Sequence, residues 1–518
     1  MNQLSPSSIT RLTFPSTCER RTWLRDVAKL DEAPDGPFAK FIKQQGLRHE
    51  ARVLDELRGA HPDLVDLKGF ENDDAAAQTA ELVAAGGPLI FQGKLQSEAL
   101  IGGEQQLIYG YPDFLIPEDG GWVIADAKLT RRIFDEGKDG TMKERSTKKA
   151  IFLQLRLYGW LFEQMFPGTA FSLRVYNGSG GIEAVEYHGG DQPLTELARI
   201  VELRRLKAEP HEVVGWSKCG ACGYREHCWP AAEAEQALGL VIGIDTRLAP
   251  KLEAVGISSY AQLAEQLDAV ALARIKSQKG DNIAGAQQIL ENVEALISGE
   301  TVRRRDLDGN EVAVDPVVNQ AANFVIFDLE GLPPELDEAE KVYLWGMQVF
   351  GEQQGEFIAA LADFGEDGDR HGWEQFLARA AELLSEHPGI RFVHWANYEK
   401  KMLDRYIERY GDDEAGTAAT VLASLLDLLP ITRAVVAIPE PSYSLKVVEK
   451  SEAVVALTGF SRSADDVTKG DDSIAAFIEA VETEDMTRRD EIVAAICAYN
   501  QEDLEATWAV LRWLRAVG

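Results

Sequence analysis

Two aspartates and a lysine have a spacing that could create a site for metal-dependent hydrolysis, in which the aspartates bind a divalent ion and the lysine assists the attacking water. Asp113 lies in the sequence GYPDFLI, and Asp126 and Lys128 lie in IADAKL. Because side chains alternate along a strand, Asp126 and Lys128 are expected on the same face. Carboxylates hold a divalent ion that acidifies water and neutralises a phosphate, while a lysine orients the nucleophile or stabilises charge. Phosphodiester hydrolysis needs such an arrangement, but an Asp-x-Lys in isolation is more often a surface ion pair.

Three polar residues flank this segment. His49 lies upstream in the helical sequence GLRHEARVL, and Gln154 and Tyr158 lie downstream in QLRLY. The i, i+4 spacing of Gln154 and Tyr158 places them one turn apart on one helix face. These residues strengthen the interpretation of the Asp-x-Lys as part of a site.

A second group of carboxylates lies in the last third of the chain. The strand-like sequence NFVIFDLEG places Asp328 and Glu330 on one face. Far downstream, YNQEDLEAT places Tyr499 and Asp503 at i and i+4 on one helix face. Acidic residues are plentiful in this chain, so the ordered set counts for more than the Asp-x-Glu alone.

Three of the five cysteines cluster in SKCGACGYREHC, as Cys219, Cys222 and Cys228. Sites built from such spacing usually need four ligands, so a fourth is expected elsewhere. A split set of four cysteines suits tetrahedral zinc or an iron-sulfur cluster, and spacing leaves both open. Cys497, in the C-terminal helical sequence, is expected to be an ordinary buried thiol.

Hydrophobic patterns place these residues on particular elements. Two strand-like runs, QLIYGYPDFLI and GWVIADAKL, are separated by the turn-rich PEDGG and predict a β-hairpin. Residues 236–300 read as short helices with glycine punctuation, as in a helix-hairpin-helix whose amides grip phosphate. Because Asp245 follows Gly243 and Ile244, the usual second glycine is absent, and a simple helical spacer is the alternative. A new α/β pattern begins after the linker RRRDLDGNEVAVDP.

Charge limits the class of protein. The formal net charge of −32 argues against a general nucleic-acid coat, because phosphate affinity rests on clustered Lys and Arg. It does not exclude a nuclease, whose metal sites need carboxylates. The basic segments 130–149 and 302–306 would guide a strand or form a solvated surface. The sequence contains neither a membrane-span pattern nor a signal-peptide pattern, so we expect a cytoplasmic protein without a membrane partner.

The first set of residues resembles the RecB-type nucleases of the PD-(D/E)XK superfamily, in the family's order over roughly residues 10–230. The resemblance implies that His49, Asp113 and Asp126 bind Mg²⁺ or Mn²⁺, helped by the carbonyl of Ala127. Lys128 would then serve the attacking water. Gln154 and Tyr158 would contact DNA.

The same resemblance extends to the cysteines. Iron-sulfur members of this family, including AddB-like and CRISPR-associated nucleases, place one cysteine before the nuclease core and three after it. Cys18, in STCERRTW, would be the fourth ligand beside Cys219, Cys222 and Cys228. The resemblance favours a [4Fe-4S] cluster, with zinc as the alternative.

The second set resembles the DEDD exonucleases of the ribonuclease H-like fold, in the subclass with a tyrosine four residues before the last aspartate. By resemblance Asp328, Glu330, Glu399 and Asp503 would hold two metal ions, and Tyr499 would orient water for 3′-to-5′ removal of nucleotides. Glu399, in FVHWANYEKKML, stands where the family usually has Asp, which places geometry and activity in doubt. The reserve candidates are Asp404 and Asp427.

Taken together, the order of parts resembles bacterial RecB-type nucleases fused to a ribonuclease H-like domain. We expect an α/β multidomain protein with a restriction-endonuclease-like PD-(D/E)XK domain over 1–235. A small helix-hairpin-helix-like domain would follow over 236–305, and a ribonuclease H-like 3′-5′ exonuclease domain over 315–518.

The expected function is metal-dependent hydrolysis of DNA, at single strands or ends. The alternatives are an RNA-processing 3′-5′ exonuclease and a non-catalytic nucleic-acid-binding scaffold. The sequence lacks a GxxxxGK[ST] phosphate loop, so unwinding would require a separate helicase among its repair or defence partners.

Overall fold

The computed structural model describes residues 2–14, 16–70, 72–118, 120–137, 140–277, 279–333, 336, 340–364, 367–463 and 470–518. The chain divides into two compact units. The first comprises Met1–Glu212, Ala221–Tyr224 and Pro333–Ala339, and the second comprises Val213–Gly220, Arg225–Leu332 and Glu340–Gly518. Each unit has hydrophobic clusters of its own.

A six-stranded sheet with the order β11-β10-β7-β6-β3-β2 forms the centre of the first unit. Its strands are β2 (Val65–Asp66), β3 (Ile90–Phe91), β6 (Phe114–Glu118), β7 (Gly121–Lys128), β10 (Ala170–Asn177) and β11 (Ile182–Val185). β6 and β7 pair antiparallel, as the predicted hairpin requires, and β7 pairs parallel with β10. The first residue of β7 is Gly121, and a larger residue would not fit there, because its Cβ would lie 2.3 Å from the Ala170 carbonyl oxygen.

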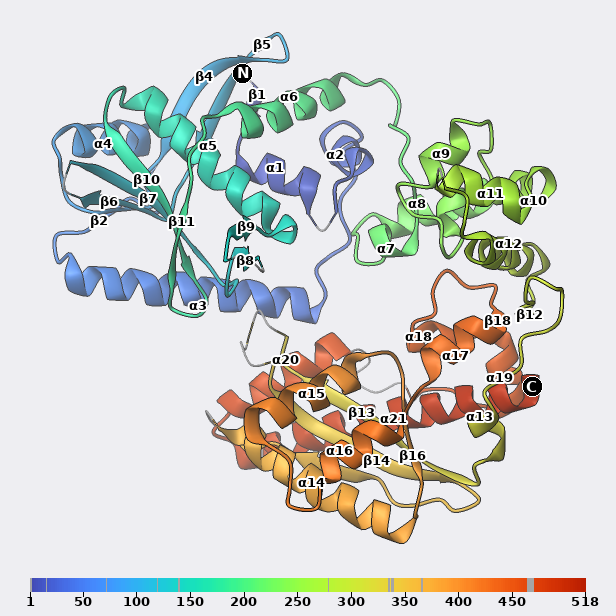
Figure 1. Ribbon diagram of the computed structural model, residues 1–518. Helices are drawn as coiled ribbons and strands as arrows, with labels where there is room; N and C mark the ends of the chain where they lie inside the picture. The colour runs from blue at the N-terminus through green and yellow to red at the C-terminus, as the bar shows by residue number, and fades with distance from the viewer. Residues whose placement is uncertain are drawn as a thin grey trace. The chain divides into compact units, whose positions relative to one another are not determined.

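Helices cover both faces of this sheet (Figure 1). Val123 and Ala125 pack with residues of α3 (Pro37–Ala60), whereas Trp122 and Ile124 pack with residues of α5 (Lys149–Met165). Most of β7 is therefore buried on both sides, which explains its nearly continuous apolar sequence. The first unit also contains α1 (Pro6–Thr13), α2 (Glu19–Asp26), α4 (Asn72–Ala84), α6 (Asp191–Arg205), η1 (Ser146–Lys148), β8 (Phe134–Glu136) and β9 (Met142–Glu144).

The run QLIYGYPDFLI is not one strand. Its first half is β5 (Glu104–Gly110), which belongs to a separate three-stranded sheet with β1 (Asn2–Leu4) and β4 (Leu95–Ile101). Its second half is β6. Pro112 lies between them, and because proline has no N–H to give to a ladder, the chain changes sheets at this position.

The second unit begins with helices that form two apolar clusters. They are α7 (Trp216–Cys219), α8 (Arg225–Ala234), η2 (Leu238–Leu240), α9 (Ala249–Glu253), α10 (Tyr260–Gln266), α11 (Ala269–Lys276) and α12 (Ile283–Ser298). One of the two clusters contains residues of α7 and α8. The Asp245 carboxylate accepts hydrogen bonds from the N–H groups of Arg247 and Leu248, at 3.0 and 2.9 Å. An anion of the chain thus occupies amides that a phosphate would need, which favours the spacer interpretation.

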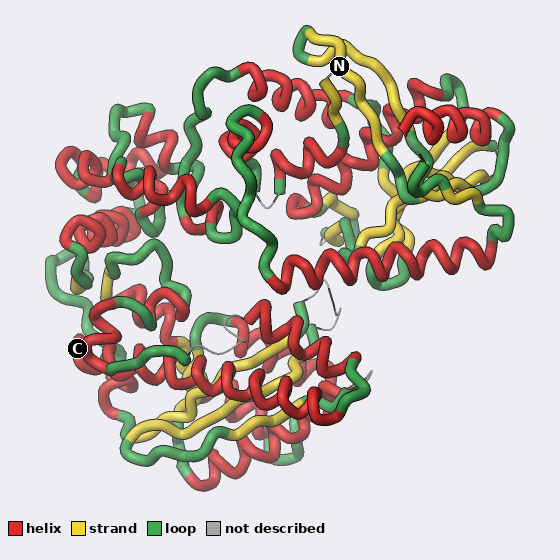
Figure 2. Tube along the Cα trace, turned by 180° about the vertical axis from the view of Figure 1, so that it is seen from behind, coloured by secondary structure: helices red, strands yellow, loops and turns green. Residues whose placement is uncertain are grey.

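A five-stranded sheet with the order β15-β14-β13-β16-β17 forms the rest of the second unit. Its strands are β13 (Asn323–Gly331), β14 (Val342–Gly351), β15 (Ile358–Leu361), β16 (Arg391–His394) and β17 (Leu425–Asp427). β13, β14 and β15 pair antiparallel, and β16 and β17 continue from β13 in parallel. Helices lie on both faces of the sheet (Figure 2). The other elements of this part are the helices α13 (Pro316–Gln320), α14 (Gly368–Glu386), α15 (Tyr398–Tyr410), α16 (Thr417–Ser424), α17 (Leu428–Val435), α18 (Leu445–Val448), α19 (Glu452–Thr458), α20 (Gly470–Glu482) and α21 (Met486–Val517) and the short strands β12 (Val302–Arg303) and β18 (Val436–Ala437).

Arg304 connects the helical part of this unit to the sheet-containing part. Its buried guanidinium lies 2.9 Å from the Glu291 carboxylate and donates to Asn292 and to the Tyr443 hydroxyl, at 2.7 and 3.0 Å. β12, which immediately precedes it, pairs with β18. The basic segment 302–306 therefore contains a structural arginine that is not available to a nucleic acid.

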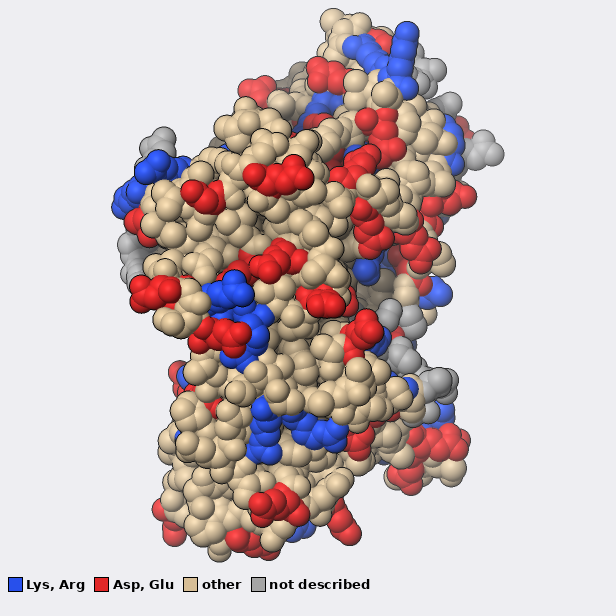
Figure 3. Space-filling view, turned by 90° about the vertical axis from the view of Figure 1, so that its right-hand side faces the viewer, with Lys and Arg blue, Asp and Glu red and all other residues tan. Residues whose placement is uncertain are grey.

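The other basic segment, 130–149, contains β8, β9 and η1, and its residues 138 and 139 lie outside the described residues. On the face drawn in Figure 3, Lys and Arg form small separate groups among Asp and Glu. Among the described residues, no helix is long and apolar enough to cross a membrane.

Candidate active sites

The first acidic site forms where β6 begins and β7 ends. The Asp113 N–H donates to Asp126 Oδ1 at 3.1 Å, and the Ala127 N–H donates to Asp113 Oδ2 at 2.8 Å. Gln92 donates to Asp113 Oδ1 at 2.8 Å. Lys128 Nζ lies 2.8 Å from Asp126 Oδ2, a buried oxygen that receives no directed hydrogen bond. The strand pairing thus brings the two aspartates and the lysine into one cluster.

Burial and the negative charge of Asp126 raise the pKa of Asp113 to about 8. Burial lowers the pKa of Lys128, but the charges of Asp126 and Asp113 outweigh it, so the net change is upward. The cluster therefore holds one more proton at neutral pH than free side chains would. A divalent cation would relieve the repulsion between the carboxylates and displace that proton.

His49 reaches the same end of the sheet from α3. Its Nε2 lies 3.0 Å from the carbonyl oxygen of Tyr176, whose residue pairs with Ala127, and its Nδ1 lies 3.0 Å from the Arg52 guanidinium. Within the described residues, the ligand atoms of His49, Asp113 and Asp126 do not all lie within 4.8 Å of one another. The structure thus places His49 against the strand that pairs with the end of β7, with its ring nitrogens engaged by Tyr176 and Arg52.

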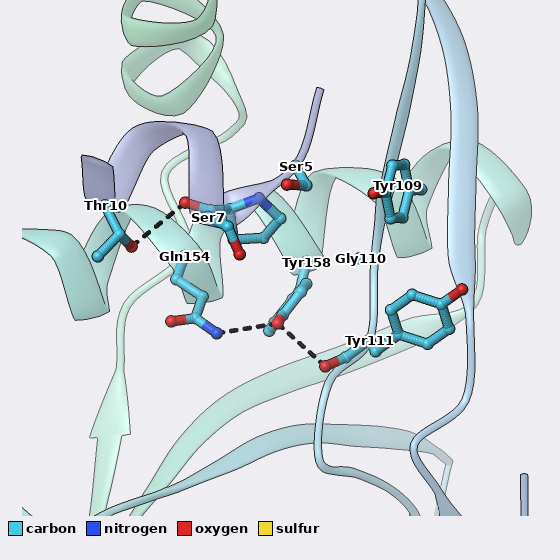
Figure 4. A pocket seen from close by; sticks show the side chains of 9 residues that line it. Ser5, Ser7, Thr10, Tyr109, Gly110, Tyr111, Gln154 and Tyr158 are labelled. Atoms are coloured by element: carbon cyan, nitrogen blue, oxygen red, sulfur yellow. Dashed lines mark hydrogen bonds between the residues drawn. The ribbon is translucent and has the colours of Figure 1, made fainter. Parts of the chain in front are cut away.

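A pocket of about 360 Å³ lies beside the segment that leads to Asp113, and Tyr111, Gln154 and Tyr158 are among its lining residues (Figure 4). Gln154 donates to the Tyr158 hydroxyl at 2.9 Å, and that hydroxyl donates to the Tyr111 carbonyl at 3.0 Å. Gly110 permits this packing, because a Cβ there would lie 2.4 Å from the Tyr158 ring. Gln154 is partly exposed, whereas Tyr158 is buried and holds the segment that leads to Asp113.

The second acidic site lies where β13 meets α21. Carboxylate oxygens of Asp328, Glu330 and Asp503 all lie within 4.8 Å of one another. Asn500 Nδ2 donates to Asp328 Oδ2 at 2.8 Å, and Tyr499 lies one turn before Asp503 on the same helix. Strand alternation and the i, i+4 helix spacing together bring these residues into one site, so their arrangement suits a divalent cation.

Glu399 lies close to this group without joining it. His394 Nδ1 lies 3.2 Å from a Glu399 carboxylate oxygen, and the Glu399 charge contributes to the raised pKa of Asp328. Of the reserve candidates, Asp427 caps α17 and accepts the Ala396 N–H at 2.9 Å. Asp404 is exposed and pairs with Lys400 on the surface of α15.

Comparison with known families identifies the two domains that contain these sites. The sequence model of the PD-(D/E)XK nuclease superfamily matches residues 6–229, and that of the RNase_H superfamily matches residues 325–515. The chain has a PD-(D/E)XK nuclease domain at its N-terminus and an RNase H-like domain at its C-terminus. It is a multidomain α/β nuclease that hydrolyses phosphodiester bonds, and its substrate is a nucleic acid.

Two solved structures are similar to part of the chain. The crystal structure of SSO0001 is 16% identical, covers 44% of this chain and 86% of that chain, and has a TM-score of 0.25. The crystal structure titled "Putative exonuclease" from Eubacterium rectale is 16% identical, covers 44% of this chain and 88% of that chain, and has a TM-score of 0.27. No curated protein matches the chain.

The RNase H-like domain contains residues near its site that the sequence analysis missed. Tyr343 donates to a Glu330 carboxylate oxygen at 3.3 Å and shares a 2.9 Å hydrogen bond with Ser473. Lys446 and Arg462 both contact Asp503. No periodic pattern marks the two cations, because they lie 57 and 41 residues from Asp503 in the chain.

The pKa values of the RNase H-like site are strongly perturbed. Burial and the charges of Asp503, Glu399 and Glu330 raise the pKa of Asp328 well above its usual range. Burial and Asp503 raise the pKa of Glu330 to about 8. Burial and the neighbouring carboxylates also raise the pKa of Tyr499, so its phenol stays protonated and can donate to a water molecule.

The cysteines are positioned by short local elements. Cys18 is the N-cap of α2 and its sulfur accepts the Arg21 N–H at 3.4 Å. Cys219 is buried in an apolar cluster against which Cys228 packs. All five cysteines are described, and none forms a disulfide bond. Burial raises the pKa of Cys497 to about 11, which makes this thiol unreactive.

We predict that Glu330→Gln stabilises the metal-free protein at pH 8. An unfolded Glu ionises near 4.5, whereas folded Glu330 keeps its proton to about pH 8. A raised carboxylate pKa lowers the free energy of unfolding as pH rises through that window, because the folded protein binds the extra proton. Glutamine resembles the protonated form, so unfolding in EDTA should cost about 1 to 3 kcal/mol more at pH 8 and little more at pH 5.

Chemical denaturation in EDTA at the two pH values measures this difference. Glu356→Gln, an exposed substitution between β14 and β15, is the matched control and should change neither value. An equal gain at pH 5 and pH 8 would show that packing, and not charge, controls Glu330.

Proposed function

We propose that this nuclease acts on DNA, at single strands or ends, with a PD-(D/E)XK site that cleaves and a second exonuclease site that removes nucleotides from the 3′ end. The observation that carries the proposal is that both nuclease domains gather buried carboxylates whose pKa values are raised. Buried carboxylic acids with raised pKa values lower the free energy of unfolding of the metal-free protein at neutral pH. This loss of stability is explained if the groups bind cations.

The residues present fit Mg²⁺ or Mn²⁺, which prefer oxygen ligands. In the PD-(D/E)XK domain, Asp113 and Asp126 would hold the ion, with His49 beside them and the carbonyl of Ala127 as a further donor. In the RNase H-like domain, Asp328, Glu330 and Asp503 would hold it, with Glu399 beside them. When bound, the ion lowers the pKa of water and neutralises phosphate charge.

The chain's own residues would do the remaining work. Lys128, held at 2.8 Å from Asp126, places an ammonium where it can orient a water molecule and offset developing charge. Gln154 would present its partly exposed amide to the DNA. Tyr158 positions the segment before Asp113 through its hydrogen bond to the Tyr111 carbonyl. In the second site the protonated Tyr499 orients the attacking water. These roles together describe hydrolysis without a covalent intermediate.

The choice of DNA over RNA is tested by offering labelled DNA and RNA of the same sequence with Mn²⁺ or with EDTA. We expect cleavage of DNA that requires the metal. Clear preference for RNA would instead support an RNA-processing 3′-5′ exonuclease run by the RNase H-like domain. Binding without cleavage on every substrate would support a scaffold. Because the sequence lacks a P-loop motor, we also propose a separate helicase among its repair or defence partners.

We further propose that Cys18, Cys219, Cys222 and Cys228 ligate a [4Fe-4S] cluster. The spacing of the cysteines fits a site with four thiolates, and the resemblance in their order, with one before and three after the nuclease core, favours the cluster over zinc. We predict about four iron and four sulfide per chain in protein purified without oxygen. Iron and acid-labile sulfide analysis measures this, and Cys497→Ser, which changes the fifth cysteine, should leave the content unchanged. Stoichiometric zinc without sulfide would contradict the cluster and favour a tetrahedral zinc site.

A further inference from the structure

Two cations contact the same carboxylate oxygen in the RNase H-like site. Lys446 Nζ lies 2.7 Å from Asp503 Oδ1, and the Arg462 guanidinium donates to that oxygen as well. The Lys446 ammonium also lies 4.3 Å from the centroid of the Tyr499 ring. Both cations therefore contact the carboxylate that the proposed function assigns to a metal ion.

The two cations differ in what else holds them. Arg462 donates to both carboxylate oxygens of Glu449, at 2.6 and 2.7 Å, and the Glu449 side chain is fully buried. The Arg462 side chain is 12% exposed, whereas that of Lys446 is 35% exposed. Among the described residues, Asp503 is the one carboxylate within ion-pair distance of Lys446. Arg462 is thus fixed by a second anion, whereas Lys446 has one ion-pair partner among the described residues and otherwise contacts the Tyr499 ring.

A divalent ion held by Asp503 would repel the ammonium that now lies 2.7 Å from Asp503 Oδ1. Lysine has a long flexible stem and a compact charge that binds phosphate from many directions. A nucleic-acid phosphate that arrives at the site brings the anion that the displaced ammonium needs.

We propose that Lys446 is a phosphate-binding residue of the RNase H-like site, which exchanges Asp503 for a phosphate oxygen of the substrate when the metal binds. This inference rests on the proposed metal-dependent exonuclease function. Arg462 remains on Glu449 and is a positioning residue that holds α21 and Asp503 in place. The exchange keeps the ammonium paired in both states, and it couples metal uptake to substrate binding.

The test uses the full-length Asp126→Asn protein, so that the PD-(D/E)XK site does not contribute. Binding of Mn²⁺ is measured by titration calorimetry, and binding of thymidine 5′-monophosphate is then measured in saturating Mn²⁺. In Lys446→Met we expect Mn²⁺ to bind several-fold more tightly, because a competing cation is gone. The nucleotide should bind about tenfold more weakly, because a charge-assisted hydrogen bond is lost.

Lys450→Met, which removes an exposed lysine one turn beyond Lys446, should change neither value. Lys446→Arg keeps the charge and should restore most of the nucleotide affinity, which also guards against a Lys446→Met protein that fails to fold. Unchanged nucleotide affinity in Lys446→Met, with Mn²⁺ binding intact, would overturn this inference alone. Failure of the parent protein to bind Mn²⁺ at all would overturn the proposed function of the site, and this inference with it.

Discussion

Asp126→Asn should reduce cleavage by the PD-(D/E)XK site at least about 10³-fold, because a metal ligand supplies several kcal/mol of charge stabilisation in the transition state. The substitution keeps an oxygen for the Asp113 N–H, which now donates to Asp126 Oδ1. It removes the charge that pairs with Lys128. The folded protein should therefore survive while the chemistry is lost, and a thermal unfolding curve verifies the first part.

The substrate for this measurement is single-stranded DNA that is labelled at its 5′ end and blocked at its 3′ end. The block prevents the RNase H-like site from starting, so Mn²⁺-dependent cleavage reports the PD-(D/E)XK site. Asp63→Asn changes an exposed carboxylate in the same unit and should cleave like the wild type. Cleavage that survives in Asp126→Asn would assign this domain a role in holding DNA.

The elements that carry the first site follow from local sequence signals. Alternation along β7 indicates that Asp126 and Lys128 share a face, and the antiparallel pairing of β6 with β7 brings Asp113 beside them. The family models confirm the PD-(D/E)XK and RNase H-like domains that the motifs predict. The assignments of individual site residues stay predictions.

Other features could not be derived from the sequence because they depend on contacts between distant segments. The division of QLIYGYPDFLI between two sheets depends on which partner strands are available to β5 and β6, and a single run of residues does not contain that information. Similarly, the contacts of Lys446 and Arg462 with Asp503 join segments with no common periodicity. Asp245, by contrast, makes a local contact, because its carboxylate accepts the N–H of Leu248 three residues later. This contact accounts for an aspartate at the position where a helix-hairpin-helix usually has its second glycine.

The structure also separates carboxylates that look equivalent in the sequence. Asp404 and Glu399 lie on one helix, but Asp404 is exposed and Glu399 is buried. Of the two, Glu399 is the one whose charge contributes to the raised pKa of Asp328, and a charge in a low-dielectric interior perturbs its neighbours far more than a hydrated one. The abundance of acidic residues in this chain therefore matters less than the few that the fold removes from water.

Asp328→Asn should abolish the 3′-to-5′ ladder, again by at least about 10³-fold. Asp328 lies at the centre of the second site, since the charges of Asp503, Glu399 and Glu330 all act on it. Asparagine keeps an oxygen and the volume but weakens the ligand set. Because the pKa of Asp328 is raised, its ionised form is disfavoured in the fold, and the neutral amide should leave the metal-free protein at least as stable. The substrate is 5′-labelled single-stranded DNA with a free 3′ end, digested by proteins that also carry Asp126→Asn.

Asp404→Asn is the matched control, because it changes an exposed aspartate of the same domain that pairs only with Lys400 among the described contacts. It should give the same ladder as the parent protein. A ladder that persists in Asp328→Asn would show that the RNase H-like site is not the exonuclease. If the ladder disappears in Asp328→Asn while internal cleavage of the 3′-blocked substrate by the Asp328→Asn single variant continues, the two domains hold two independent nuclease sites. That result follows physically from the separate carboxylate clusters, each of which has its own ligands and its own raised pKa values.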